Sequence, residues 1–256
     1  MSAFSRLAAP ALATLAAIAI FCALGVWQVQ RLAWKEALIA SVDARVKASP
    51  IAAPGPAQWR SADLAAMEYL PVKLSGSFDH NREIHLFTAL TQPKGRLGGP
   101  GYLVFTPLTT DEGWTVFVNR GFVAMERKSP STRAQGQVSG EVEISGLLRL
   151  PEARNWYSAR DSLAQNVWYT RDPLAFAAAL SMPTATLAPF IVDSFANSSL
   201  AEGMPQGGET IIQFPNSHLG YAITWFGLAL SVLGVFAAFA IGRLREEASP
   251  PSISSS

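Results

Sequence analysis

Two long apolar runs, one near each end, constrain this chain more than any other feature of its sequence. Residues 7–29 read LAAPALATLAAIAIFCALGVWQV and residues 219–241 read LGYAITWFGLALSVLGVFAAFAI, without an acidic or basic side chain. About 20 helical residues at about 1.5 Å each span a hydrocarbon layer of about 30 Å. Both runs are therefore predicted to be transmembrane helices. The first is too long for a signal-peptide core and is expected to remain as an anchor.

The composition narrows the class of protein. The chain has 256 residues, of which 49% are hydrophobic and 15% charged, and its formal net charge is +1. Proteins that bind nucleic acid usually carry a strongly basic face, which this charge balance does not indicate. The single cysteine, Cys22, cannot form an intramolecular disulfide and lies inside the first apolar run. We therefore expect membrane lipid around the anchors and no nucleic-acid partner.

Basic residues near the ends of the two runs do not decide the orientation in the membrane. The two sides would carry similar numbers of them: Arg6, Arg243 and Arg245 against Arg31, Lys35, Arg45 and Lys47. The positive-inside rule needs a clearer excess. Only six residues precede the first run, which leaves no room for an amphipathic, Arg-rich mitochondrial presequence. A bacterial inner-membrane location is therefore expected.

The segment between the runs is predicted to fold as an α+β domain in which strands dominate. Six stretches rich in Val, Ile, Phe, Tyr and Thr alternate with turn residues: 69–78, 82–90, 101–110, 114–123, 141–150 and 188–195. This pattern is typical of a mostly antiparallel sheet or a partly closed barrel. One helix is predicted over 172–182, with Asp172 as its N-cap and Pro173 at its first position.

The predicted organisation has four parts. A transmembrane helix covers 7–29, an extramembrane domain 30–218, a second transmembrane helix 219–241 and a short polar tail 242–256. The first helix is expected to continue past the membrane through WKEALIASVDARVKA, and the proline-rich PIAAPGPAQW then forms a linker. The fold class is thus an α+β membrane protein with two transmembrane helices flanking a β domain.

The middle domain offers no recognisable catalytic constellation. His80 and His85 are five residues apart, which neither places them on one strand face nor matches an HExxH zinc helix. We expect both to be solvated. The glycine-rich KGRLGGPG precedes a strand, whereas phosphate-binding motifs precede a helix, so it is predicted to be a flexible loop. Without a nucleophile, an acid–base pair or a metal site, enzymatic activity is not expected.

A histidine at the start of the second run is the most informative single residue. Asn216 is a candidate N-cap, which places His218 in the first helical turn at the membrane surface. The positive end of the helix dipole and partial burial both favour the neutral, metal-ligating imidazole. Ala222, Trp225 and Ala229 follow at i+4, i+7 and i+11, and a flat ligand can lie along such a stripe.

Simpler interpretations of this helix stay open. Tyr221, three residues after the histidine, can donate a hydrogen bond at headgroup depth, but Tyr and Trp are also enriched in membrane-interface belts. A histidine at a helix start can also be a solvated cap residue. A second stripe is predicted to be a helix–helix contact because its residues are small: Gly220, Gly227, Ser231 and Gly234.

The end of the first run carries a matching set of groups. Trp27, Arg31 and Trp34 fall at i, i+4 and i+7, which places a guanidinium between two indoles. Aromatic anchoring and snorkelling are sufficient to explain each residue. The functional alternative is that Arg31, with Lys35, pairs with carboxylates of a ligand held by His218.

Five motifs resemble, in order, those of the Surfeit locus protein 1 family, membrane proteins that assist the assembly of cytochrome c oxidase. They are GVWQVQRLAWK, GYLVFTPL, VNRGFV, NVWYTRD and HLGYAITWFGLA. The first contains Trp27, Gln28, Arg31 and Trp34, and the last begins at His218. For Asn119, Arg120 and Gly121 we expect a structural role, with a glycine that needs a left-handed or tight-turn backbone.

The resemblance implies a domain in the periplasm, both termini in the cytoplasm, and binding of haem a. It implies His218 as the axial ligand of the haem iron, with the other candidate cofactor-binding residues being Tyr221, Trp225, Arg31 and Trp27. Cytochrome c oxidase subunit I is the implied client, and haem a synthase is a further candidate partner. A haem-independent scaffold for subunit I intermediates is the alternative, and a haem-modifying enzyme is a third. The second axial ligand stays open, with His80 and His85 the only other histidines.

Overall fold

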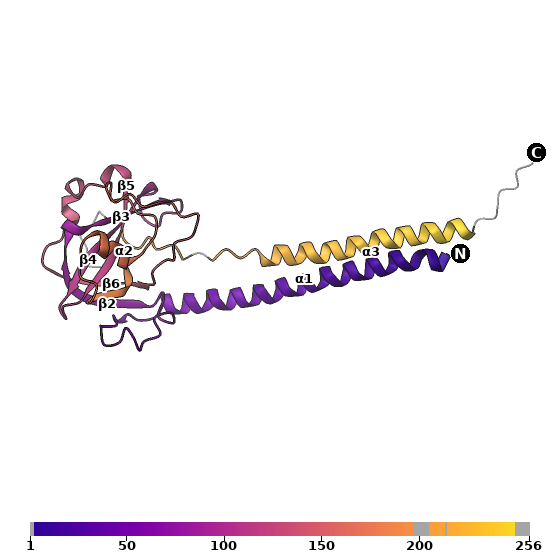
Figure 1. Cartoon of the computed structure of the whole chain (residues 1–256), viewed down its shortest axis with the longest axis horizontal. Helices are drawn as coiled ribbons and strands as arrows, with labels where there is room; N and C mark the ends of the chain where they lie inside the picture. Colours follow the sequence, from indigo (N-terminus) through magenta and orange to yellow (C-terminus); the bar gives the residue numbers. More distant parts are fainter. Residues whose placement is uncertain (1–2, 197–204, 213, 249–256) are drawn as a thin grey trace, which may run out of the picture. The chain divides into compact units, whose positions relative to one another are not determined.

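The protein consists of a helical unit and a β-rich unit, which we call the barrel unit. The structure, a computed structural model, describes residues 3–196, 205–212 and 214–248 (Figure 1). The helical unit lies within residues 1–41 and 213–256, and the barrel unit comprises residues 42–212. The predicted class, an α+β protein with an apolar helix on either side of a β domain, is confirmed.

In the part of the chain that the structure describes, two helices are long and apolar enough to cross a membrane. They are α1, Ala3–Val46, and α3, His218–Ala248. The predicted continuation of the first helix beyond its apolar run is confirmed, since α1 reaches Val46. The polar tail begins inside α3, and its residues 249–256 lie outside the described residues.

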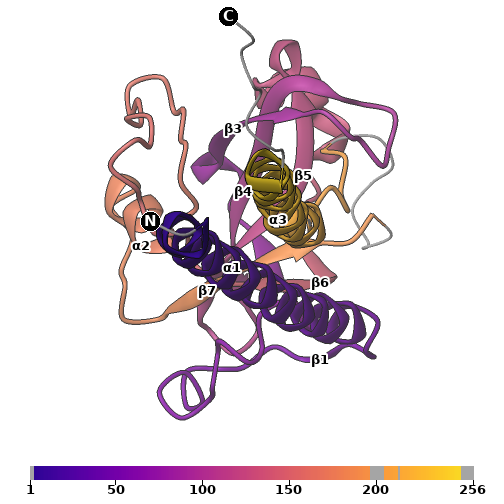
Figure 2. The same cartoon turned by 90° about the vertical axis from the view of Figure 1, so that its right-hand side faces the viewer.

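In the helical unit, α1 and α3 contact each other in antiparallel orientation. Gln28 contacts His218, and Phe21, earlier in α1, contacts Trp225, later in α3. Figure 2 looks nearly along the two helices, so that α1 and α3 are seen as separate helices. The hydroxyl of Thr224 donates to the carbonyl oxygen four residues earlier (2.9 Å), which satisfies this polar group within its own helix.

The barrel unit contains a closed five-stranded barrel with two additional strands. The strands are β1 Ile51–Ala52, β2 Pro71–Phe78, β3 Ile84–Leu90, β4 Gly99–Thr110, β5 Thr115–Ala124, β6 Glu141–Arg149 and β7 Leu187–Ser194. The barrel order is β2, β6, β7, β5, β4, and β4 pairs again with β2. Pairing is antiparallel except between β5 and β7 and between β1 and β2. All six predicted strands and their mostly antiparallel pairing are confirmed.

Closure of the barrel depends on a close approach between β2 and β4. At Gly76 of β2, an added Cβ would lie 2.2 Å from the carbonyl oxygen of Thr109 in β4. Only a residue without a side chain allows the two backbones to come this near. The strand pattern predicts β2, whereas this contact determines where the sheet closes.

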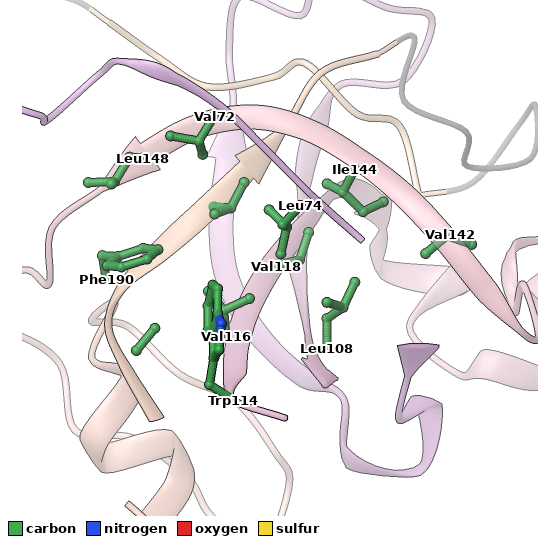
Figure 3. Packing of buried hydrophobic residues seen from close by; sticks show 12 residues of the cluster. Val72, Leu74, Leu108, Trp114, Val116, Val118, Val142, Ile144, Leu148 and Phe190 are labelled. Atoms are coloured by element: carbon green, nitrogen blue, oxygen red, sulfur yellow. The ribbon is translucent and has the colours of Figure 1, made fainter. Parts of the chain in front are cut away.

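The barrel interior is apolar because every second residue of its strands points inward. Figure 3 shows these side chains converging from β2, β4, β5, β6 and β7. The cluster of buried residues comprises Val72, Leu74, Leu108, Trp114, Val116, Val118, Val142, Ile144, Leu148, Ala188, Phe190 and Val192. This interior is filled with side chains and forms the first hydrophobic core of the unit.

A second core lies outside the barrel, under helix α2, Pro173–Ala179. Phe176 of α2 is fully buried, and its ring lies 5.5 Å from that of Phe105 and 5.3 Å from that of Phe117, between ring centroids. Asp172 caps the helix, its Oδ1 accepting from the backbone N–H of Leu174 (2.9 Å). The predicted helix and its N-cap are confirmed, although α2 ends three residues before the predicted boundary.

The predicted linker 50–59 is part of the folded unit. Its first residues form β1, and Trp59 packs edge to face against Trp114 with ring centroids 5.8 Å apart. The indole N–H of Trp59 donates to the carbonyl of Pro54 (2.8 Å). The prolines indicated an irregular backbone, but burial of the indole against the barrel core fixes it in place.

Candidate functional site

Helix α3 begins at His218 itself, so the imidazole stands in the first helical turn as predicted. The residue before it, Ser217, occupies the cap position, and its carbonyl accepts from the backbone N–H of Tyr221 (3.2 Å). Asn216, the predicted N-cap, lies one residue further out. His218 is partly buried.

The Nδ1 atom of His218 lies 2.8 Å from Oε1 of Gln28 in α1. An amide oxygen only accepts hydrogen bonds, so Nδ1 must be the donor. A neutral imidazole carries a single proton, and Nε2 is then left with its lone pair. The described residues supply no hydrogen-bond partner to Nε2. This arrangement is the one that a metal-ligating histidine requires.

The stripe of α3 that begins at His218 faces α1. Ala222 and Ala229 are buried, and the ring of Trp225 stacks on Phe21 with centroids 5.8 Å apart and planes 27° apart. Helix α1 therefore covers the part of the stripe that lies beyond His218. The sequence pattern suggested a surface for a flat ligand, whereas in the structure the small residues admit the neighbouring helix.

The glycines of the second stripe of α3 do not make the contact with α1. A Cβ added at Gly220, Gly227 or Gly234 would meet nothing within 4 Å. The close approach occurs instead at Gly25 of α1, where an added Cβ would lie 2.7 Å from the ring of Phe226. Large rings on one helix need a small residue on the other, and this complementarity selects the contact face.

The aromatic and basic residues at the end of the α1 apolar run are exposed. The guanidinium carbon of Arg31 lies 4.6 Å from the ring centroid of Trp34, which confirms one of the two predicted stacking contacts. Among the described residues, no carboxylate pairs with Arg31. Trp27 is 50% exposed and Tyr221 is 56% exposed. These side chains are available for contacts with lipid or with a ligand.

A buried charged cluster, centred on Glu83, lies in the barrel unit. The Oε1 atom of Glu83 accepts from Arg120 (3.2 Å), Arg133 (3.1 Å) and Gln137 (3.1 Å), and Oε2 accepts from Arg133. Both guanidinium groups are inaccessible to solvent. Arg120 also donates to the carbonyl of Gly136. These bonds tie β5 and the segment 127–137 to the start of β3.

The prediction that His80 and His85 are solvated is wrong. Nε2 of His80 donates to the carbonyl of Val138 (2.8 Å), and its Nδ1 accepts from Arg120 (3.2 Å). His85 is 6% exposed; its Nδ1 accepts from Asn166 (3.1 Å), and its Nε2 lies 3.5 Å from Glu83. The fold brings the two imidazoles to one carboxylate, which a spacing of five did not indicate. Every ring nitrogen of these two histidines has a polar neighbour.

The electrostatics of this cluster favour the ionised carboxylate. Burial by itself would raise the pKa of Glu83, but the neighbouring polar side chains of His80, His85 and Arg133 and the charge of Arg133 outweigh it. The pKa of Glu83 is therefore held well below its usual range. Burial lowers the pKa of Arg120 to about 10, against the attraction of Glu83. Both groups are charged at neutral pH, and their pairing is what makes burial tolerable.

The Asn119-Arg120-Gly121 motif forms a β-bulge. The pairing of β4 with β5 shifts register here, and Arg120 is the extra residue that turns inward toward Glu83. Gly121 has φ +124°, and a Cβ at this position would lie 2.0 Å from the carbonyl oxygen of Gln206. A structural role for the motif is therefore confirmed: the glycine has a positive φ, as expected, and it lies in a bulge.

The sequence analysis did not identify three residues of these sites: Gln28, Glu83 and Arg133. Gln28 stands in a recognisable motif, but nothing local indicates that it would meet a residue 190 positions later. Glu83 lies between two histidines in HNREIH, which is a usable signal of a polar cluster. Arg133 lies in an irregular segment and had none.

Comparison with known proteins gives a match that covers most of the chain. Residues 15–230 match the model of the SURF1 family. The chain belongs to the SURF1 family. Relatives named Surfeit locus protein 1 include that of Rattus norvegicus, 40% identical over 215 residues, covering 80% of this chain and 67% of the relative. The Homo sapiens protein is 37% identical over 217 residues (80% and 69%), and that of Takifugu rubripes 34% identical over 233 residues (87% and 93%).

The SURF1 match includes both residues of the contact between the helices, since Gln28 and His218 lie within residues 15–230. It also includes the whole barrel unit, so the Glu83 cluster and the bulge at Gly121 belong to the matched region. The family assignment thus extends over every site described above.

Proposed function

We propose that this SURF1-family protein binds haem a through His218 and assists its insertion into subunit I of cytochrome c oxidase. The observation that carries the proposal is the hydrogen bond between His218 Nδ1 and Gln28 Oε1 (2.8 Å). It directs the Nε2 lone pair away from α1, as in histidines that bind a metal.

The residues present fit a haem better than a free metal ion. Among the described residues, no group of three or more His, Cys, Asp and Glu side chains is placed to hold a metal ion. A protein-bound metal usually needs three or four such ligands. A haem carries ligands for its own iron, so a single histidine would be enough to hold it. His218 meets that requirement alone.

Other residues of the helical unit suit the edges of a haem. Arg31 can pair with a propionate, because its guanidinium stacks on Trp34 and has no carboxylate partner among the described residues. Trp27 and Tyr221 offer exposed aromatic surface. Trp225 would contribute indirectly, because its stacking on Phe21 positions the start of α3.

The proposal places the protein in a bacterial inner membrane with both termini in the cytoplasm and the barrel unit in the periplasm. The helix start that carries His218 would then lie at the periplasmic surface of the bilayer. The proposed partners are oxidase subunit I, which receives the haem, and haem a synthase, which supplies it. The role is that of a non-enzymatic assembly factor.

The test is an optical spectrum of the full-length protein, purified in detergent from a host that makes haem a. Pyridine extraction identifies the haem. We expect a haem a spectrum in the wild type and in the Asn216→Ala control, whose substitution lies two residues away on an exposed position. His218→Ala is expected to lose the haem. An unchanged haem content in His218→Ala would refute the assignment of the ligand.

A haem-independent scaffold is the second candidate, and one exposed feature favours it. Trp156 is 96% exposed and Tyr157 is 69% exposed, and their rings meet edge to face at 5.5 Å. Exposed aromatic pairs are typical of protein–protein contact surfaces. In cells unable to make haem a, the scaffold predicts co-purification with subunit I that Trp156→Ser weakens. Loss of co-purification whenever haem a is missing would contradict it.

A further inference from the structure

We propose that Gln28 is a positioning residue, which holds His218 in the tautomer with its proton on Nδ1 and thereby presents Nε2 to the iron. The step to iron rests on the proposed function above. The tautomer is a property of the chain itself, and it can be measured without haem.

The contact is specific in its chemistry. Gln28 is 8% exposed and its Oε1 faces the imidazole at 2.8 Å, whereas Gln30, two residues later on the same helix, is exposed. A buried amide oxygen without a donor is destabilising, and the Nδ1–H of His218 supplies that donor. Gln28 and His218 therefore select each other's orientation.

The surrounding contacts hold this pair in register. Phe21 lies seven residues before Gln28, and Trp225 lies seven residues after His218, so the polar pair and the stacked rings are two turns apart on each helix. Gly25 lies between them and admits the ring of Phe226. The three contacts belong to one antiparallel interface, which holds Gln28 opposite the imidazole.

The tautomer matters because a ring nitrogen that carries a proton has no lone pair with which to bind a metal. A histidine in water favours the proton on Nε2, which would block the nitrogen that points away from α1. The partner of the other nitrogen sets which one is protonated. Removing the Gln28 oxygen should return His218 toward the Nε2–H form and leave the ring free to rotate.

The experiment uses the full-length protein with ¹⁵N-labelled histidine in detergent micelles, without haem. The protein has three histidines, and His218→Ala assigns the signal of interest. The spectra are recorded at about pH 8.5, where histidine side chains are generally neutral. Gln28→Met removes the acceptor at similar length, Gln28→Glu keeps an acceptor, and Gln30→Met is the matched control.

We expect Nδ1–H at His218 in the wild type, in Gln30→Met and in Gln28→Glu, and a shift toward Nε2–H in Gln28→Met. A wild-type His218 with its proton on Nε2, or a Gln28→Met spectrum like that of Gln30→Met, would overturn the proposal. Should Gln28→Met fail to fold, Gln28→Glu carries the test, because a stronger acceptor must retain Nδ1–H.

Haem binding supplies the second readout. Loss of the partner of a ligating histidine typically weakens metal binding about 10–100-fold, which we expect for Gln28→Met relative to Gln30→Met. Gln28→Glu should lower the reduction potential of the bound haem, because a stronger acceptor makes the imidazole a stronger donor to iron. Equal haem affinity in the two Met variants would refute the positioning role. A wild type without haem would refute the proposed function, while the tautomer result would still decide the role of Gln28.

Discussion

Replacing Glu83 by glutamine should destabilise the barrel unit more than a typical surface substitution. The change keeps the size of the side chain but removes the negative charge that, among the described residues, pairs with Arg120 and Arg133, both inaccessible to solvent. It also points an amide N–H₂ group at guanidinium donors. The two cations would then be buried without a counter-charge.

The magnitude follows from the burial of all three groups. Breaking a buried ion pair by removing one partner costs about 3–5 kcal/mol. With a dependence of unfolding free energy on urea of about 2 kcal/mol per molar, the urea midpoint should fall by about 2 M. An exposed ion pair contributes about 0–1 kcal/mol, so its loss would barely move the midpoint.

The assay is urea unfolding of the full-length protein in a mild detergent, followed by tryptophan fluorescence. Trp114 and Trp168 are buried in the barrel unit and report on its unfolding. Glu152→Gln is the matched control, because Glu152 pairs with Arg171 at 2.9 Å but its side chain is 48% exposed. Equal midpoints for Glu83→Gln and Glu152→Gln would refute the reasoning.

The same cluster gives a pH dependence with a defined sign. The pKa of Glu83 lies below its ordinary value of 4.5 in the folded chain, so its contribution to stability is complete above that value. The contribution is lost as the pH falls from there toward the lower folded pKa. The difference in unfolding free energy between wild type and Glu83→Gln should therefore be constant near neutral pH and shrink below about pH 4. A difference that grows on acidification would contradict the assigned charge state.

Two glycine substitutions test the close approaches. Gly25→Val should weaken the contact between α1 and α3, because an added Cβ lies 2.7 Å from a ring, whereas Gly227→Val should not, because nothing lies within 4 Å of its added Cβ. Cysteine cross-linking of positions 21 and 225 measures the difference between the two variants. Equal cross-linking would refute the assigned contact face. Gly121→Ala should lower the free energy of unfolding by more than about 2 kcal/mol, because a positive φ is combined with a backbone clash at 2.0 Å. Gly113→Ala, with φ +84° and open space around its added Cβ, should lower it by about 1 kcal/mol. Thermal unfolding of the two alanine variants compares these costs, and equal losses would show that the clash is absent.

Local patterns in the sequence were enough to predict the secondary structure. Runs without charge predicted both apolar helices, stretches rich in Val, Ile, Phe, Tyr and Thr between turn residues predicted the six long strands, and Asp172-Pro173 predicted the start of α2. These signals are local, because a helix turn or a strand pleat repeats within a few residues. The position of His218 at a helix start is local in the same sense.

Contacts between distant residues followed no such pattern. Which stripe of α3 faces α1 depends on how Phe226 fits against Gly25, whereas the sequence had suggested a helix contact for the glycine stripe. The partner of His218 lies 190 residues away in Gln28. Side-chain complementarity between two helices decides such pairings, and it is absent from either helix considered alone.

The sequence by itself therefore determined the kind of protein: two apolar helices, a β-rich domain between them, and a histidine at the start of the second helix. Only the tertiary structure decided which groups meet. It closed the sheet through Gly76, brought His80 and His85 to Glu83, and placed the amide of Gln28 against His218. The physical reason is that helix and strand formation depend on neighbours along the chain, whereas burial and hydrogen-bond pairing depend on neighbours in space.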